Sequence, residues 1–167
     1  MSARAEFDRL IDEITAAIAG RPLDHALTDE LNRRFPPEGE TFQALWRACE
    51  AGVAEGWLCE NERNGVRYGR PVKPSPKTRG FSVDVVRLND MRGPYHRHPH
   101  GEIDMIMPID GHAKFDGHGA GWWVYGPETA HYPTVSGGDA LVLYLLPEGA
   151  IDFKAKPPAE SQATQPS

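Results

Sequence analysis

The sequence predicts a mainly β protein, a small sandwich or barrel, preceded by a short helical region. Apolar residues recur at helical spacing up to about residue 54, and they alternate with a period of two from about residue 57 onward. Glycine and proline, 17 and 15 of the 167 residues, crowd into the second half, where they separate the apolar runs. A chain of this length fits one domain of ordinary size.

Three short helices are expected within residues 1–56. The first apolar stripe runs from Phe7 to Ile18, with Ser2 as the candidate N-cap and Gly20 placed to end the helix. A second stripe spans residues 23–35 and stops at two prolines, and a third spans residues 42–54. None of the stripes carries a cluster of catalytic residue types. We therefore expect the three helices to pack against the rest of the protein.

Residues 57–153 are expected to form the barrel. Alternation predicts a strand over residues 81–88, and apolar runs follow at 103–109, 122–125 and 140–146, separated by glycine-rich turns. Short strands at this spacing are typical of an all-β sandwich or barrel. Residues 154–167 have no apolar period and are expected to form a disordered tail.

Composition and charge exclude several classes of partner. With 18 Lys and Arg against 24 Asp and Glu, the net charge of −6 leaves no basic excess for a phosphate backbone, so nucleic acid is not expected as a partner. No stretch approaches the roughly 20 apolar residues that a membrane span needs, and the start lacks the pattern of a signal peptide. We therefore expect a cytoplasmic protein without a membrane partner. Cys49 and Cys59 are expected to be reduced thiols.

Histidine is the most unevenly distributed residue type, since six of the seven lie between His96 and His131. Three of them stand at alternate positions and are followed by two acidic residues of the same parity: His96, His98, His100, Glu102 and Asp104. Alternate side chains of a strand share one face, about 6.6 Å apart, so imidazole and carboxylate groups could converge on one ion. Such ligands suit zinc, iron, manganese or nickel. The same face could equally be the solvated side of a strand.

The order of these residues resembles the paired motifs of the cupin superfamily. In that superfamily two histidines and a glutamate on one strand, with a third histidine after a proline-containing turn, hold a metal inside a jelly-roll barrel. The turn matches residues 126–131 here, and the matching ligands are His96, His98, Glu102 and His131. His100 is the substitute for either neighbour. The resemblance implies a cupin-type jelly-roll β-barrel with a divalent metal ion, for which Fe, Mn, Zn and Ni stay open.

Four longer segments look like the bacterial 4-hydroxylaminobenzoate lyase family. They span Ala54–Cys59, Val66–Pro76, His96–Met105 and Phe115–His131. The resemblance implies a lyase that converts 4-hydroxylaminobenzoate to 3,4-dihydroxybenzoate (protocatechuate) and releases ammonia, a step in nitrobenzoate breakdown. Its partner would be a small aromatic substrate. By analogy with other cupins, a homodimer is expected.

This chemistry needs an acid, an activated water, or both. Asp104 shares the parity of Glu102, so we expect it in the same cavity, either as a proton shuttle or as a partner that orients a ligand histidine. Tyr125 and His100 are weaker candidates for the same catalytic work.

The ring and the carboxylate of such a substrate also need partners. Trp122 is a candidate for the wall of an aromatic pocket. The candidates for binding the carboxylate are Arg70 and Lys73, which lie in a proline-rich stretch that predicts a loop. A planar guanidinium suits bidentate hydrogen bonding to a carboxylate. Arg70 is therefore the preferred candidate.

Two other functions stay open from the sequence. A metal-dependent cupin oxygenase acting on a small aromatic substrate would consume dioxygen, which the lyase reaction does not require. A non-enzymatic cupin that binds a ligand would hold no metal, which elemental analysis would detect.

Overall fold

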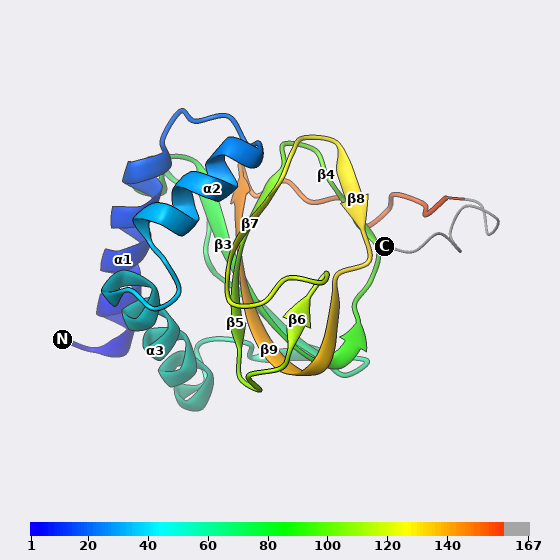
Figure 1. Cartoon of the computed structure of the whole chain (residues 1–167), viewed down its shortest axis with the longest axis horizontal. Helices are drawn as coiled ribbons and strands as arrows, with labels where there is room; N and C mark the ends of the chain where they lie inside the picture. Colours follow the sequence, from blue (N-terminus) through cyan, green and yellow to red (C-terminus); the bar gives the residue numbers. More distant parts are fainter. Residues whose placement is uncertain (159–167) are drawn as a thin grey trace.

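The computed structural model describes residues 1–158 as a layer of helices beside a β-barrel (Figure 1). The helices are α1 (Ala3–Ile18), α2 (His25–Arg34) and α3 (Glu40–Glu55). Ser2 caps α1 as predicted, because its side chain accepts a hydrogen bond from the backbone N–H of Ala5. Helix α2 begins two residues after the start of its apolar stripe because Asp24 caps it, accepting from the N–H of Leu27.

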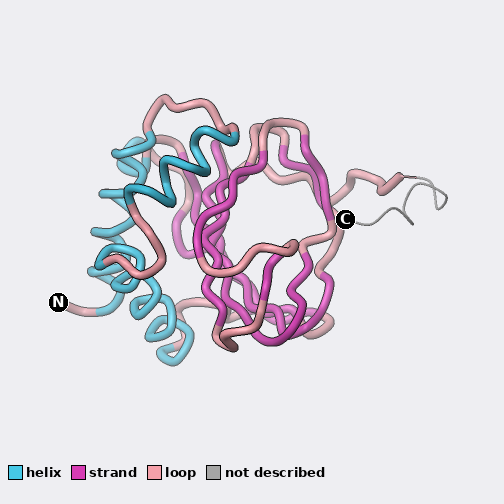
Figure 2. The backbone as a smooth tube through the Cα atoms, in the orientation of Figure 1, coloured by secondary structure: helices cyan, strands magenta, loops and turns pink. Residues whose placement is uncertain are grey.

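Nine strands follow in the described part of the chain. They are β1 (Asn61–Arg63), β2 (Val66–Val72), β3 (Phe81–Arg92), β4 (His96–His98), β5 (Glu102–Pro108), β6 (Lys114–Phe115), β7 (Gly121–Tyr125), β8 (Thr129–His131) and β9 (Thr134–Pro147). Seven form one antiparallel sheet in the order β1-β2-β3-β9-β5-β7, with β6 beside β9, while β4 and β8 form a second sheet of two strands. Figure 2 shows the strands curving round into a barrel with the helices outside it. The predicted fold class, a mainly β barrel behind a helical region, is confirmed.

Alternation along the strands divides the apolar side chains of the sheet between two cores. Ile103 of β5 and Trp122 of β7 belong to the core between the sheet and the helices. Ile106 belongs to a second core inside the barrel. Glu102 and Asp104 have the parity of Ile106, so their side chains face the barrel interior, where both are fully buried.

Helix α2 covers the outer edge of β7. The side chain of Asn32 accepts a hydrogen bond from the backbone N–H of Trp122 at 2.9 Å and donates to its carbonyl at 3.0 Å. The hydroxyl of Thr28 accepts from the N–H of Val124 at 3.0 Å. An edge strand would otherwise present these backbone groups without partners. The helix therefore both packs on the barrel and satisfies its edge.

The prediction that the proline-rich stretch around Arg70 is a loop is wrong. Residues 66–72 form β2, which pairs with β3. Pro71 is tolerated because it lies where the register between the two strands shifts, between Gly69 and Val72, so its missing N–H interrupts no regular ladder. The strand places Arg70 against the barrel, and Lys73 follows its last residue.

Residues 159–167 of the tail predicted for 154–167 lie outside the described residues. Within residues 1–158 no helix combines the length and the apolar run that crossing a membrane would take. Cys49 and Cys59 are free and buried, and burial raises the pKa of the Cys59 thiol to about 11.

Candidate metal centre

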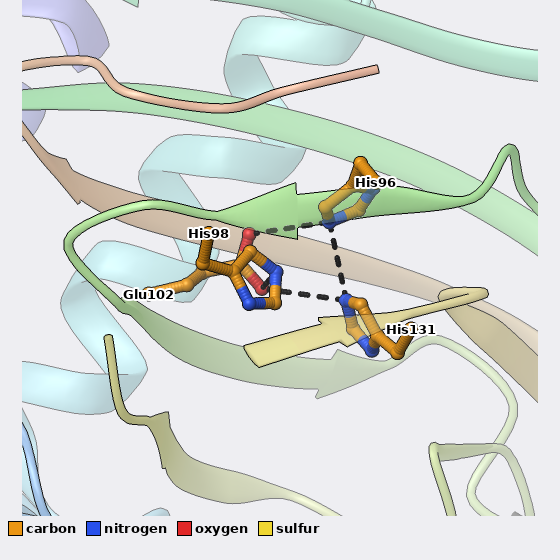
Figure 3. Close-up of side chains that lie close together, drawn as sticks. All are labelled: His96, His98, Glu102 and His131. Carbon is orange, nitrogen blue, oxygen red and sulfur yellow. Dashed lines mark hydrogen bonds and ion pairs between the residues drawn. The ribbon is translucent and has the colours of Figure 1, made fainter. Parts of the chain in front are cut away.

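Four side chains converge inside the barrel (Figure 3). His96 and His98 come from β4, Glu102 from the start of β5 and His131 from β8. Each offers one ligand atom, and these atoms all lie within 4.8 Å of one another. They are the four residues that the sequence predicted as metal ligands, and the structure brings all of them together.

Strand pairing explains how residues 35 positions apart meet. Strands β4 and β8 are antiparallel neighbours in which His96 lies opposite His131 and His98 lies opposite Thr129. The chain then turns back after His98 so that β5 begins with Glu102. The Glu102 carboxylate therefore reaches the imidazoles from the seven-stranded sheet, whereas the three histidines come from the two-stranded sheet.

The four side chains meet through the Nε2 atoms of the histidines and the carboxylate of Glu102. The Nε2 of His98 lies 3.3 Å from one Glu102 oxygen, and the Nε2 atoms of His96 and His131 lie 3.7 and 3.8 Å from the carboxylate. The Nε2 atoms of His96 and His131 are 3.1 Å apart. Three imidazole nitrogens and a carboxylate therefore point at one small volume.

Each imidazole is fixed by a hydrogen bond at its other nitrogen. The Nδ1 of His96 faces the carbonyl of Pro94 at 3.2 Å, and the Nδ1 of His131 faces a carboxylate oxygen of Asp116 at 2.6 Å. The Nδ1 of His98 faces the hydroxyl of Thr129 at 2.9 Å. Carbonyl and carboxylate oxygens only accept hydrogen bonds, so the first two rings carry their proton on Nδ1.

The hydroxyl of Thr129 leads to the same tautomer for His98. It donates its own proton to the carbonyl of Gly126 at 2.7 Å, so towards His98 it accepts. All three neutral rings thus present an unprotonated Nε2 to the shared volume. This is the arrangement in which outer hydrogen bonds orient histidines as metal ligands.

The ligand atoms lack partners within the protein. The Nε2 of His98 and both carboxylate oxygens of Glu102 are buried without a hydrogen bond in the described chain. Buried polar atoms without partners are costly, and charged ones more so. A cation would satisfy all of them at once, so the residues present fit a metal ion.

Electrostatics keep these ligand atoms in the forms that bind metal. Burial lowers the pKa of His98, which favours the neutral ring. Burial opposes the ionisation of Glu102, but the nearby imidazoles of His96 and His98 outweigh it and lower the pKa of this carboxyl below its ordinary value. An ionised Glu102 beside a neutral His98 is the result.

Asp104 lies next to this cluster, as its parity predicted. Its neighbours across the sheet are Tyr144 of β9 and Trp123 of β7. Neither of its carboxylate oxygens has a hydrogen-bond partner among residues 1–158. Burial, and then the charge of Glu102, raise the pKa of Asp104 well above its ordinary value. The site therefore combines an ionised carboxylate with a carboxyl group that tends to keep its proton.

Two further residues complete the surroundings of His131. The hydroxyl of Tyr125 donates to the same Asp116 oxygen that accepts from His131, and the Tyr125 ring lies 4.7 Å from that imidazole. Tyr125 was predicted, but Asp116 was missed. An Asp followed by Gly117 is typical of a turn, and no feature of the sequence distinguishes its role as the acceptor that orients His131.

The comparison with known families decides which kind of barrel this is. The model of the family described as "PnbB: 4-hydroxylaminobenzoate lyase" matches residues 9–153. The chain belongs to the 4-hydroxylaminobenzoate lyase family. It is 32% identical to the 4-hydroxylaminobenzoate lyase of Pseudomonas putida, over 93% of this chain and 99% of that protein. It is 33% identical to that of Nocardioides sp. (strain LMS-CY), over 90% of this chain and 92% of that one. The predicted family and the prediction of an enzyme are confirmed.

Solved structures show more distant likeness to this lyase-family chain. An oxalate oxidase in complex with glycolate is 20% identical, with a TM-score of 0.43 over 56% of this chain and 57% of that one. A cupin 2 domain-containing protein from Halorhodospira halophila is 18% identical, with a TM-score of 0.43 over 62% and 77%.

Three predicted site residues of this lyase-family enzyme lie away from the cluster, and of these only His100 was predicted as a metal ligand. Strand β4 ends at His98, and a turn through Gly101, at φ +91°, interrupts the alternation. The ring of His100 is 52% exposed and pairs with Glu148, so His100 is not among the residues that the structure brings together. Trp122 faces the helices and donates its indole N–H to the carbonyl of Phe35. Lys73 follows the last residue of β2 and does not line the barrel cavity.

A cavity of about 900 Å³ leads to the cluster of this lyase-family enzyme, and His96 forms part of its wall. Arg70, which was predicted to bind the substrate carboxylate, also lines it. Its guanidinium, however, already donates to both oxygens of Asp84, at 2.7 and 3.0 Å, and to the carbonyl of Gly149 at 3.2 Å. Burial raises the pKa of Asp84, although Arg70 opposes the rise.

Proposed function

We propose that this enzyme converts 4-hydroxylaminobenzoate to protocatechuate and releases ammonia. Membership of the lyase family supports the proposal, and the convergence of three imidazoles and a carboxylate is the observation that carries it. The substrate plus one water equals the two products in atoms and electrons. The reaction therefore needs no external electron carrier, only acid–base chemistry at the nitrogen and the ring.

We propose that His96, His98, Glu102 and His131 hold a divalent metal ion. Nitrogen and carboxylate donors of this kind suit Fe, Mn, Zn or Ni. When bound, such an ion supplies Lewis acidity, which polarises an oxygen of the substrate or lowers the pKa of water. The orphaned, buried ligand atoms described above support this assignment.

Asp104 is the group that moves the proton. With its raised pKa, it holds a proton on a carboxyl oxygen inside the buried site. It gives that proton to the hydroxylamino oxygen as the N–O bond breaks, so that this oxygen leaves as water. The Asp104 carboxylate then accepts a proton from the water that adds to the neighbouring ring carbon. Hydrolysis of the resulting imine releases ammonia.

The other residues of the site position these groups. Asp116 and Thr129 hold the rings of His131 and His98 by their Nδ1 atoms, so the Nε2 atoms stay aimed at the shared volume. The ring of Tyr125 stacks on His98, with centroids 5.4 Å apart. Tyr125 therefore closes one side of the site while its hydroxyl stays bound to Asp116.

The organisation around the site follows from the same proposal. Residues 1–56 act as a helical cover on the barrel of residues 57–153, and the substrate is a small aromatic acid. We also propose that the enzyme is cytoplasmic and forms a homodimer.

The test is a product analysis without oxygen. Purified enzyme is incubated anaerobically with 4-hydroxylaminobenzoate, and protocatechuate and ammonia are measured together. Equal amounts of both are expected. If turnover required dioxygen, the enzyme would be an oxygenase rather than a lyase. The absence of either product would overturn the proposed reaction.

A further inference from the structure

Arg92 ends strand β3 at the point where that strand meets the segment after His131. Its backbone pairs with Thr134 of β9, and the N–H of the next residue, Gly93, donates to the carbonyl of Pro133 at 2.7 Å. Arg92 and His96 both line the barrel cavity. The backbone at Arg92 is therefore fixed relative to the segment that follows His131.

The side chain of Arg92 is held by an aromatic ring rather than by an acid. Its guanidinium carbon lies 4.0 Å from the centroid of the Tyr132 ring, and Tyr132 in turn packs against Tyr95 with centroids 4.9 Å apart. Stacking uses the face of the guanidinium and leaves the N–H groups at its edge free to donate. No acidic side chain within residues 1–158 is paired with Arg92.

Arg70, the arginine expected from the sequence, differs in this respect. It lines the same cavity, but three of its N–H donations go to Asp84 and Gly149. A substrate carboxylate at Arg70 would have to compete with a carboxylate that is already in place. Arg92 offers the same bidentate geometry without that competition.

The proposed reaction sets which end of the substrate faces the histidine cluster. The hydroxylamino oxygen has to lie near Asp104, which is fully buried, and near the histidine cluster. The carboxylate is at the opposite end of the ring, so it points away from the cluster and needs a cationic partner elsewhere on the cavity wall.

We infer that Arg92 binds the carboxylate of the aromatic substrate, with the hydroxylamino group at the opposite end of the ring directed at the histidine cluster. The inference rests on the proposed function, and it adds the residue that recognises the carboxylate and so determines which end of the substrate faces the cluster. It gives the cavity a means of binding the substrate in one direction. Tyr132, which holds the guanidinium, belongs to the same subsite.

Binding of 4-aminobenzoate to the metal-loaded enzyme tests the inference without turnover, because this acid has no N–O bond to break. Calorimetry compares the wild type with Arg92→Met and with Arg63→Met. Arg63 is a matched control, since it lines the same cavity from β1. Arg92→Met is expected to weaken binding about tenfold, as loss of a charge-assisted hydrogen bond does. Arg63→Met should bind as the wild type does.

Kinetics with 4-hydroxylaminobenzoate supply a second readout. Arg92→Met is expected to raise KM about tenfold with kcat within about twofold, because the carboxylate is bound alike in the ground and transition states. Arg92→Lys should recover part of the loss, since lysine restores the positive charge but not the paired N–H donors of a planar guanidinium. Circular dichroism establishes that each variant is folded.

The outcomes separate this inference from the proposed reaction. Unchanged affinity and KM in Arg92→Met would overturn the inference, as would an equal loss in Arg63→Met, even if the wild type makes protocatechuate and ammonia. Binding of 4-aminobenzoate that depends on Arg92, in an enzyme that releases no ammonia, would support the subsite and overturn the reaction. A wild type that neither binds nor reacts would overturn both.

Discussion

The Nε2 atoms of His96 and His131 lie 3.1 Å apart, although each ring already uses its Nδ1 in a hydrogen bond to an acceptor. When both rings are neutral, neither has a proton left for this contact, and two lone pairs face each other. A cation held by both nitrogens and by Glu102 turns this repulsion into attraction. The contact is therefore the clearest sign of a metal site in the protein.

Replacing a proposed ligand should remove the metal without unfolding the chain. His98→Ala is expected to bring the metal content to well under one ion per chain and to abolish ammonia release, because it removes one of the four ligand atoms that meet in the cluster. Elemental analysis of untagged protein gives the content, and circular dichroism monitors the fold. His100→Ala is the matched control: this exposed ring pairs with Glu148, so its loss should leave the metal content unchanged. A fully active His98→Ala enzyme would contradict the metal assignment.

Asp104→Asn separates proton transfer from metal binding. Asparagine keeps the shape of the side chain but cannot donate and recover an acidic proton, so kcat should fall about 100-fold or more. The metal content should stay at the wild-type level. Steady-state kinetics and elemental analysis on the same preparation check both. Loss of metal together with activity would show instead that Asp104 supports the ligands.

The hydrogen bond from His131 to Asp116 should contribute to metal affinity. Asp116→Asn removes the negative charge that orients and polarises this imidazole, and the metal dissociation constant should rise about tenfold or more. Competition with a chelator of known affinity measures it. Tyr125→Phe removes the other donor to the same oxygen but leaves the histidine bond, so its affinity should change less than about threefold. Equal effects in the two variants would argue against an orienting role for Asp116.

Much of the fold and the ligand set could be predicted from the sequence because both follow from short-range patterns. The helical stripes and the period-two runs gave the three helices and the long strands, although β3 and β9 extend several residues beyond their apolar runs, through backbone pairing with each other. The ligands were predictable since their types and order match a known motif. Strands of two or three residues, such as β6 and β8, carry too little pattern to be seen.

The errors came from features that depend on the tertiary structure. The alternation from His96 to Asp104 suggested one continuous strand, but the turn at Gly101 takes His100 out to solvent. Trp122 and Trp123 are neighbours, and only the position of the helices decides that Trp122 packs outside the barrel. Asp116 lies 15 residues before its histidine, and nothing local distinguishes it from a turn residue.

The buried carboxyl of Asp84 should make the stability of the metal-free protein depend on pH. Its pKa is raised in the folded state, chiefly by burial, so above its unfolded pKa of about 4 the folded state holds a proton that the unfolded state has lost. The free energy of unfolding therefore falls as the pH rises through this interval and levels off above the folded pKa. Asp84→Asn lacks this component. Urea unfolding at several pH values between 4 and 7 gives the free energy of unfolding as a function of pH. This free energy should fall less steeply with pH in the variant than in the wild type, and parallel profiles would refute the assignment.

The most direct test of the account follows turnover of 4-hydroxylaminobenzoate by the same enzyme before and after its metal is removed. Protocatechuate and ammonia should appear in equal amounts with the loaded enzyme, stop after chelation, and return when a single divalent metal ion per chain is restored. Undiminished release of both products by enzyme that elemental analysis shows to be free of metal would contradict it.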